Sequence, residues 1–252
     1  MAHRLTSHRL RSWTSLALAV VAATSTAAAC GGGGGGDEGE GGGAGQPKPA
    51  GRAALAGTAY TSDQLEQALL TEAPGYRRNG EPDSGEYGAL KAIQNFNQLQ
   101  RQVTIDKPAC GNYGSTRPGG PPVDKTAPAA IISFTKGSGQ SVTETLMSMS
   151  ADAADKHVNS RIPDGCETFR TKVGGQWADH RVVQPPPGQI GDGSRTVGIT
   201  TSSGGSTLKS WYVVLRGRRY VATISLVGPR ATRAEAEQLA RQADAQARRI
   251  LP

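Results

Sequence analysis

The reactive side chains that say most about this chain are its three cysteines, Cys30, Cys110 and Cys166. A cysteine thiol binds a metal, performs redox chemistry, forms a disulfide or accepts a lipid. The sequence has no Cys-x-x-Cys pair, and beyond residue 30 its histidines, His157 and His180, do not stand at ligand spacing from a cysteine. We therefore expect no metal site and no cofactor. In an exported domain, Cys110 and Cys166 are most simply one disulfide that closes a loop of roughly 55 residues.

Residues 1–29 predict that the chain is exported. Arginines within the first eleven residues form a basic leader without any acid, and an apolar run over residues 16–23 and then small residues follow. This is the order of a secretory signal peptide. The apolar run is too short for a membrane span, which needs about 20 predominantly apolar residues.

The stretch Ala27-Ala28-Ala29-Cys30 resembles the lipobox of bacterial lipoproteins, with Ala27 in place of the usual leucine. The resemblance implies that the Cys30 thiol is acylated and becomes the first residue of the mature chain. A diacylglyceryl group would supply the two acyl chains that stable anchoring needs. We therefore expect a lipid anchor on Cys30 at the extracytoplasmic face of the cell membrane. The alternative is an ordinary cleavage that releases the protein.

Composition then divides the rest of the chain. Residues 30–57 are rich in glycine and cannot bury a core, so we expect a flexible tether there. Residues 58–252 suit one globular domain. Removing the three leader arginines lowers the formal net charge from +7 to +4, and aromatic residues make up only 5% of the chain. Scattered basic residues without interleaved aromatics exclude a nucleic-acid partner.

Hydrophobic periodicity predicts the elements of the domain. Apolar residues at steps of three and four indicate helices that cover about 61–73, 87–99, 141–160 and 232–250. Period-two patterns and a short apolar run indicate strands over about 129–135, 169–173, 177–183, 195–201, 208–215 and 219–227. Together they predict an α+β fold, an antiparallel β-sheet with helices packed on one face, in a single domain behind the N-terminal tether.

The clearest element is the predicted hairpin over residues 208–227. Gly217-Arg218 is typical of a type II′ turn and pairs Arg216 with Arg219. That register places an apolar set on one face, which must be covered. The other face is polar enough to be wetted and to hold a ligand. Our candidate ligand-binding residues lie there: Ser210, Tyr212, Thr223 and Ser225.

The order of these features resembles the PknH-like extracellular sensor domains of actinobacterial kinases and lipoproteins. The resemblance rests on the helix that opens at Thr61, the two cysteines that flank a long predicted helix, the segment Gly191–Ser194 and the hairpin. It implies an α+β domain whose sheet face forms a ligand-binding cleft. The kinase sensor has a second disulfide that this chain lacks.

The sequence shows no recognisable catalytic set. There is no Gly-x-Ser-x-Gly motif, and Asp179 and His180 are neighbours on a predicted strand, so their side chains point to opposite faces. We therefore expect a non-catalytic, sensor-like domain at the cell envelope whose ligand is a small molecule, a lipid or an envelope polymer. The alternative is an interaction or structural lipoprotein that docks a partner protein.

Overall fold

A computed structural model describes residues 60–114 and 121–251. The predicted signal peptide, the lipidation site Cys30 and the tether over residues 30–57 lie outside the described residues. No helix within the described ranges is long and apolar enough to cross a membrane. Residues 60–114 and 121–251 fold into helices on an antiparallel sheet, which confirms the expected α+β class.

The helices are short apart from the last one. They are α1 (Ser62–Ala68), α2 (Lys91–Gln100), α3 (Ala151–Val158) and α4 (Arg233–Ile250), with 3-10 turns η1 (Tyr87–Ala89) and η2 (Pro108–Gly114). The strands are β1 (Arg77–Arg78), β2 (Asp83–Glu86), β3 (Thr104–Ile105), β4 (Pro128–Lys136), β5 (Gln140–Ser148), β6 (Thr168–Val173), β7 (Gln176–Val183), β8 (Ser194–Ser203), β9 (Ser206–Arg216) and β10 (Tyr220–Gly228).

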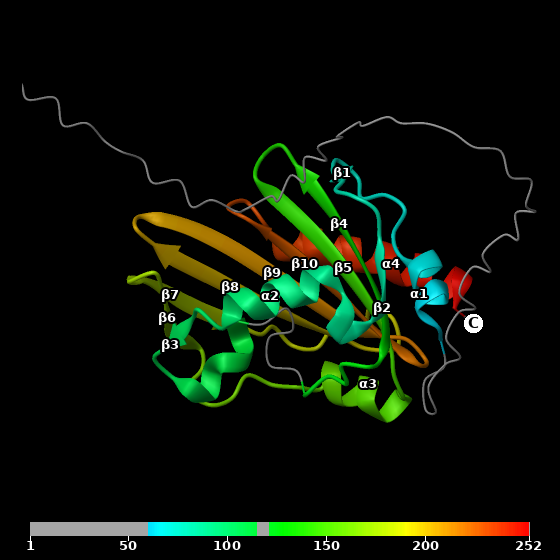
Figure 1. The fold of residues 1–252 in the computed structure, drawn as a ribbon, viewed down its shortest axis with the longest axis horizontal. Coiled ribbons are helices and arrows are strands. Elements are labelled where there is room, and N and C mark those ends of the chain that lie inside the picture. Colours follow the sequence, from blue (N-terminus) through cyan, green and yellow to red (C-terminus); the bar gives the residue numbers. More distant parts are fainter. Residues whose placement is uncertain (1–59, 115–120, 252) are drawn as a thin grey trace, which may run out of the picture. The chain divides into compact units, whose positions relative to one another are not determined.

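The strands form one sheet in the order β1-β4-β5-β10-β9-β8-β7-β6-β3, and β2 pairs with β4 beside β1 (Figure 1). All of its neighbouring strands are antiparallel. The spatial order differs from the chain order in three ways: β10 lies between β5 and β9, β9 to β6 follow in reverse order, and β3 lies at the edge beyond β6. The last of the described strands is therefore an interior strand of the sheet.

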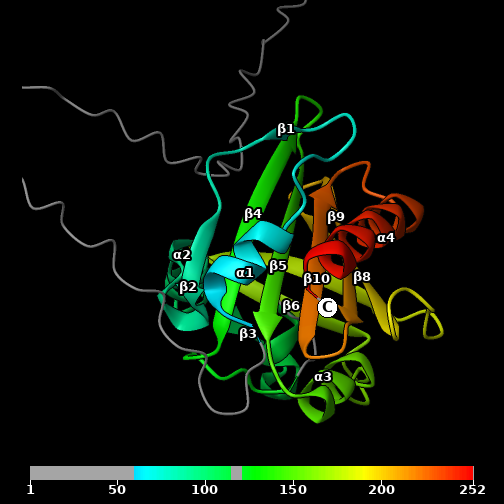
Figure 2. The same cartoon turned by 90° about the vertical axis from the view of Figure 1, so that its right-hand side faces the viewer.

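Helices cover both faces of the sheet (Figure 2). On the face that we call the α4 face, α1 and α4 bury a core that contains Leu146, Val213, Leu215, Ala222, Ile224 and Leu226. On the opposite face, which we call the α2 face, η1, α2 and α3 cover Ala129, Ile131, Met147, Val214 and Val221. The α4 face is the larger core, as the predicted apolar face of the hairpin required.

Helix α4 can approach the sheet closely because its buried stripe is built from alanine. Ala236, Ala240, Ala243 and Ala247 are fully buried along it. The Thr232 side chain caps the helix by accepting a hydrogen bond from the Glu235 backbone at 3.2 Å. The Glu235 carboxylate does not bond back to the Thr232 backbone. It accepts hydrogen bonds from Tyr76 at 2.8 Å and from Gln140 at 3.2 Å instead.

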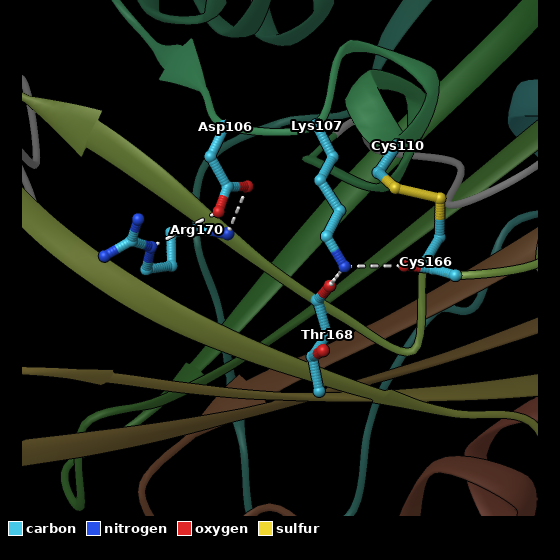
Figure 3. The surroundings of a disulfide bond; sticks show 7 residues. Asp106, Lys107, Cys110, Cys166, Thr168 and Arg170 are labelled. Atoms are coloured by element: carbon cyan, nitrogen blue, oxygen red, sulfur yellow. Dashed lines mark hydrogen bonds and ion pairs between the residues drawn. A yellow bond between two sulfur atoms is a disulfide. The ribbon is translucent and has the colours of Figure 1, made fainter.

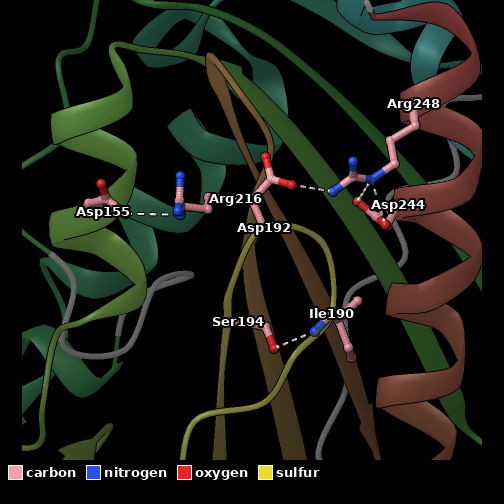
Figure 4. A network of polar contacts seen from close by, with 7 residues as sticks. All are labelled: Asp155, Ile190, Asp192, Ser194, Arg216, Asp244 and Arg248. Carbon is pink, nitrogen blue, oxygen red and sulfur yellow. Dashed lines mark hydrogen bonds and ion pairs between the residues drawn. The ribbon is translucent and has the colours of Figure 1, made fainter.

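The segment Gly191–Ser194 joins α4 to the ends of β8 and β9 (Figure 4). The Asp192 carboxylate binds the Arg248 guanidinium at 2.6 Å, and Asp244 holds the same guanidinium from one turn away. Gly191 has a φ of 68°, and a Cβ there would lie 2.8 Å from the carbonyl oxygen of Arg216. Only glycine fits such a position, because it has no Cβ and tolerates positive φ. Nearby, Arg216 also binds Asp155 of α3 at 2.9 Å.

The predicted helix over residues 141–160 is wrong. Residues 140–148 form β5, and only Ala151–Val158 is helical. Val142 and Leu146 are four residues apart, a spacing that fits one helix face and also one strand face. Both faces of β5 are largely buried, so the strand lacks the polar alternation that marks a one-sided strand. Gly139, with a φ of 76°, closes the β4–β5 hairpin rather than starting a helix.

The predicted β9–β10 register is off by two residues. Arg216 pairs with Val221 rather than Arg219, and Leu215 pairs with Ala222. The turn is therefore centred one residue later, and Gly217 does not adopt the positive φ of a type II′ turn. A Cβ at Gly217 would lie 2.1 Å from the Tyr220 ring, so close packing explains this glycine. A shift by two keeps every side chain on its predicted face.

A carboxyl group is buried in the α4 face. Glu144 lies on β5 between Ile132 and Ile224 and is completely inaccessible to solvent. Its Oε2 accepts a hydrogen bond of 2.7 Å from the Leu70 backbone, just beyond α1. Its Oε1 has no partner among the described residues. Burial, opposed only by the Leu70 hydrogen bond, raises the pKa of Glu144 to about 8.

This burial predicts that the domain loses stability as pH rises. Glu144 keeps its proton in the folded state up to about pH 8 but titrates near 4.5 when unfolded, so its contribution is complete below pH 4.5 and is lost toward pH 8. Between pH 6.5 and 8, a window above the lowered pKa of His180, the free energy of unfolding should fall by about 2 kcal/mol. Urea denaturation at both pH values measures the change.

Glu144→Gln should remove this pH dependence, because the amide oxygen still accepts the Leu70 hydrogen bond and carries no titrating proton. Glu72→Gln, at an exposed position in the neighbouring loop, should keep it. An undiminished fall in the Glu144→Gln protein would show that another group is responsible.

Candidate ligand-binding face

The structure places all four predicted ligand-binding residues on the α2 face of β9 and β10. Ser210 and Thr223 are buried, with exposed fractions of 9% and 3%. Tyr212 and Ser225 are half-buried and lie opposite each other across the two strands. The hairpin therefore brings the four together as expected, but solvent reaches mainly Tyr212 and Ser225. Their role in binding a ligand stays a prediction.

Two further hydroxyl groups extend this pair into a row. Ser225 of β10 lies opposite Thr143 of β5, and Thr143 lies opposite Ser133 of β4. Tyr212, Ser225, Thr143 and Ser133 are all half-buried. We call these four residues the hydroxyl row. It crosses four neighbouring strands on one face of the sheet.

Hydrogen bonds connect the members of the hydroxyl row. Ser133 and Thr143 are 3.1 Å apart between their hydroxyl oxygens. The Tyr212 hydroxyl bonds to the hydroxyls of Ser210 and Ser225. Burial raises the pKa of Tyr212, and the two hydroxyl partners only partly oppose this, so its phenol is neutral at physiological pH. The row thus offers uncharged groups that both donate and accept hydrogen bonds.

The hydroxyl row borders the apolar core of the α2 face. Moving along each strand, Met147 of β5 is followed by Thr145 and then Thr143, and Val221 of β10 by Thr223 and then Ser225. The first of each series is buried with Ile93 of α2, and the last is half-buried. Packing by η1 and α2 therefore ends where the hydroxyl row begins.

Sequence analysis missed Thr143 and Ser133. Thr143 fell in the segment that we expected to be helical, where it has no cross-strand neighbour. The β-branched residues Val142, Thr143 and Thr145 favour a strand and were the available signal. Ser133 lies in a correctly predicted strand, but only its pairing with β5 places it beside Thr143.

His180 occupies a second polar cluster on the same face. Its ring stacks on Phe169 with centroids 4.7 Å apart, and its nitrogens lie 2.7 Å from the Thr171 hydroxyl and 3.0 Å from the Thr201 hydroxyl. Burial lowers the pKa of His180, although Asp179 and Asp106 oppose the shift. The imidazole is therefore positioned between two hydroxyls as a neutral group. Asp179 lies opposite Arg170 on the other face, so it does not form an acid–base pair with His180.

The disulfide between Cys110 and Cys166 supports this side of the sheet (Figure 3). Both cysteines are buried with Phe169, Val182, Val197 and Ile199, and Tyr212 packs against this cluster. The Lys107 ammonium adds hydrogen bonds to the carbonyl oxygens of Gly165 at 2.8 Å and Thr168 at 2.7 Å. The predicted disulfide is confirmed, and it fixes η2 to the start of β6 beside the hydroxyl row.

Comparisons with known proteins find structural likeness only. No family model matches the chain. A search of curated proteins finds no match. Among solved structures, the extracellular domain of PknH from Mycobacterium tuberculosis matches with a TM-score of 0.49 and 13% identity, covering 75% of this chain and 97% of that one. A putative uncharacterized protein from Mycobacterium smegmatis matches with a TM-score of 0.45 and 13% identity, covering 74% and 97%.

The first of these structures is a domain of the kind that the sequence pattern resembles. At such identities and TM-scores we draw no argument about ligand, partner or activity from either match. The long helix expected between the two cysteines is replaced in this chain by β4, β5 and α3.

Removing the disulfide should destabilise the domain. The bond closes a sequence separation of 56 residues, and loss of such a constraint costs about 4 kcal/mol in the chain-entropy account. The double variant Cys110→Ala with Cys166→Ala suits this buried apolar site and should melt at a clearly lower temperature. Differential scanning calorimetry measures the change. A melting temperature equal to that of the unaltered chain would contradict the structural role of the bond.

Proposed function

We propose that this chain is a membrane-anchored extracytoplasmic lipoprotein whose domain binds a ligand at the hydroxyl row without catalysing a reaction. The observation that carries the proposal is the row itself. Four half-buried hydroxyl side chains face the same way across four strands, and a fully paired, disulfide-linked sheet holds them in place. A site on rigid strands binds without the cost of ordering loops.

The chemistry of the hydroxyl row suits a neutral polar ligand. Its members carry no charge, and each hydroxyl both donates and accepts. Tyr212 adds an aromatic surface beside the three smaller side chains. A hydroxyl-bearing ligand such as a sugar or the polar head of a glycolipid offers matching groups. Small molecules, lipids and envelope polymers all include such compounds.

The N-terminal sequence supports the proposed location. Signal-peptide order over residues 1–29 and the lipobox-like Ala27–Cys30 place the cysteine where acylation occurs in bacterial lipoproteins. The disulfide fits the same location, because disulfides persist in oxidising compartments outside the cytoplasm. A glycine-rich tether over residues 30–57 would let the domain move roughly 25–30 Å from its anchor.

The lipid anchor can be tested directly. Cys30→Ser should abolish incorporation of labelled palmitate and leave the precursor unprocessed, because the acylated thiol is then missing. Radiolabelling and the mass of the membrane-associated protein measure both effects. Cys110→Ser serves as the control and should be labelled and processed normally. Full labelling of the Cys30→Ser chain would contradict the anchor.

Ligand binding at the hydroxyl row is tested in two steps. Native mass spectrometry of the gently extracted full chain should first identify a co-purifying ligand. Ser225→Ala combined with Thr143→Val should then weaken its binding about thirtyfold, since each of the two lost hydrogen bonds is worth about 1 kcal/mol. Ser206→Ala, an exposed serine at the far end of the β8–β9 hairpin, should bind like the unaltered chain. If the double variant bound the ligand as tightly as the unaltered chain, the hydroxyl row would not be the binding site.

A partner protein is the alternative occupant of the same face. Exposed apolar side chains on this side of the molecule favour it, namely Leu99 of α2, Val173 of β6 and Leu208 of β9. Crosslinking in intact cells separates the two functions. Crosslinks from the α2 face to a single protein, with no small molecule bound after native extraction, would favour docking.

A further inference from the structure

No helix among the described residues covers the outer part of the α4 face. Helix α4 packs against β8, β9 and β10, while β6, β7 and the outer halves of β8 and β9 carry exposed residues on the same side. Three of these residues are basic, Arg170, Arg181 and Lys209, and the half-buried Lys172 lies on the same side. We call these four, together with Trp177, the cationic patch. It lies on the face opposite the hydroxyl row.

Strand register determines how the charges are spaced. Arg181 lies opposite Thr200, and Thr200 lies opposite Lys209, so the two cations are separated by one hydroxyl. With strands about 4.8 Å apart, their backbones are about 10 Å apart. Lys172 lies opposite Trp177 on the neighbouring pair of strands. The positive charges are thus distributed across the sheet and not concentrated at one point.

Within the described ranges, most of these cations have no acidic partner. Lys172, Arg181 and Lys209 form no ion pair with any residue in the described ranges. Arg170 is paired with Asp106 at 3.2 Å, and both side chains are partly exposed. Asp179 is the acid that lies between Arg170 and Ser202. The cationic patch therefore keeps an excess of positive charge in contact with solvent.

The sheet is hollowed beside Arg170 and Arg181 of the cationic patch. A solvent-open hollow of about 510 Å³ is lined by these two arginines, by Lys107, by the hydroxyl-bearing residues Thr168, Thr200 and Ser202, and by the acids Asp106 and Asp179, among others. The cations outnumber the acids there, and Asp106 is already paired with Arg170. Guanidinium groups pair with carboxylates and phosphates through two parallel hydrogen bonds. Hydroxyls beside them can bind the uncharged oxygens of the same ligand. This set is matched to a ligand that carries both anionic groups and hydroxyls.

Trp177 adds an aromatic surface beside Arg170 and Lys172 of the cationic patch. Its side chain is 39% exposed, and the Arg170 guanidinium and the Lys172 ammonium lie 4.9 Å and 5.8 Å from its ring centroid. Cations at this distance from an indole attract its π-system, so they hold the ring in place. A fixed, exposed indole beside cations offers a flat apolar surface to a sugar ring.

We infer that the cationic patch binds an anionic polysaccharide, a polymer with carboxylate or phosphate groups on sugar units. An anionic bilayer would satisfy the cations but leave the central hydroxyls and Asp179 unpaired. The exposed aliphatic residues Val173 and Leu208 point to the α2 face, whereas Val183, 45% exposed, lies on the patch side two residues from Arg181. The exposed apolar surface beside the cations is therefore small, and consists of Val183 and Trp177. A surface that inserts into a membrane instead combines its cations with an apolar face. The inference goes beyond the proposed function and does not depend on the hydroxyl row.

Binding of the full chain to immobilised polygalacturonate tests the inference, with neutral dextran as the reference. The chain should bind polygalacturonate at low salt and not dextran. Arg181→Gln combined with Lys209→Gln should weaken binding roughly two- to thirtyfold, because each exposed charge contact contributes a modest free energy. Trp177→Ala should also weaken it.

The matched control removes one arginine and one lysine elsewhere. Arg77→Gln combined with Lys91→Gln changes the net charge equally at exposed positions on β1 and α2. It should leave binding within twofold of the unaltered chain. Equal losses in the two double variants would reduce the effect to net charge and overturn the inference.

Two further results bear on it. Tighter binding to phosphatidylglycerol vesicles than to polygalacturonate would assign the patch to a membrane surface and overturn the inference. The variant Ser225→Ala with Thr143→Val should bind polygalacturonate normally, so a failure of the hydroxyl row as a site leaves this test intact. Circular dichroism of each variant confirms that it is folded.

Discussion

Strand β10 is the constraint on which the rest of the structure depends. It is hydrogen-bonded on both edges, to β5 and β9, and it is buried on both faces. Its alternate residues enter two different cores, with Ala222, Ile224 and Leu226 in one and Val221 in the other. A slip by one residue would exchange the two faces and expose the apolar set. The position of each strand beside it follows from this register.

The hydroxyl row and the cationic patch both lie where the helices stop covering the sheet. The helices on the α2 face end where the hydroxyl row begins, and α4 ends before the outer strands on the α4 face. Each surface therefore consists of strand side chains that lie beyond the helices in the described part of the chain. One is neutral and rich in hydroxyls, and the other is cationic with an exposed indole. A thin sheet thus presents two chemically different faces to its surroundings.

Much of this fold could be predicted from the sequence. The strands that follow Cys166 have a clear period-two pattern in their sequence. In β6 and β7, every second side chain lies on a face that is exposed or half-exposed, so polar residues recur there. The disulfide followed from the absence of any other partner for Cys110 and Cys166. Tyr212 and Ser225 were placed on the correct face because a strand has a fixed period of two. A turn error that shifts the pairing by two residues does not change faces.

The features that the sequence analysis missed depend on pairing between strands that are far apart in the sequence. The segment around Val142 and Leu146 has a spacing compatible with both helix and strand, and only its burial between β4 and β10 decides in favour of a strand. Thr143 and Ser133 became part of the hydroxyl row through the same pairing. The burial of Glu144 could not be predicted either, because the core positions of a central strand are expected to be apolar. Its hydrogen bond to the Leu70 backbone explains why that position is polar.

The strand order also has a consequence for assembly. The chain makes β4 and β5 first and β6 to β9 later, yet among the described strands these two groups are hydrogen-bonded into one sheet only through β10, which is made after both. Until residues 220–228 have been synthesised, β10 is missing between the two groups of strands, so β5 and β9 each have an unpaired edge. Cys110 and Cys166 can already meet before then, which would enclose β4 and β5 in a covalent loop. Completion of the sheet therefore waits until residues 220–228 have been made and can pair with β5 on one side and β9 on the other.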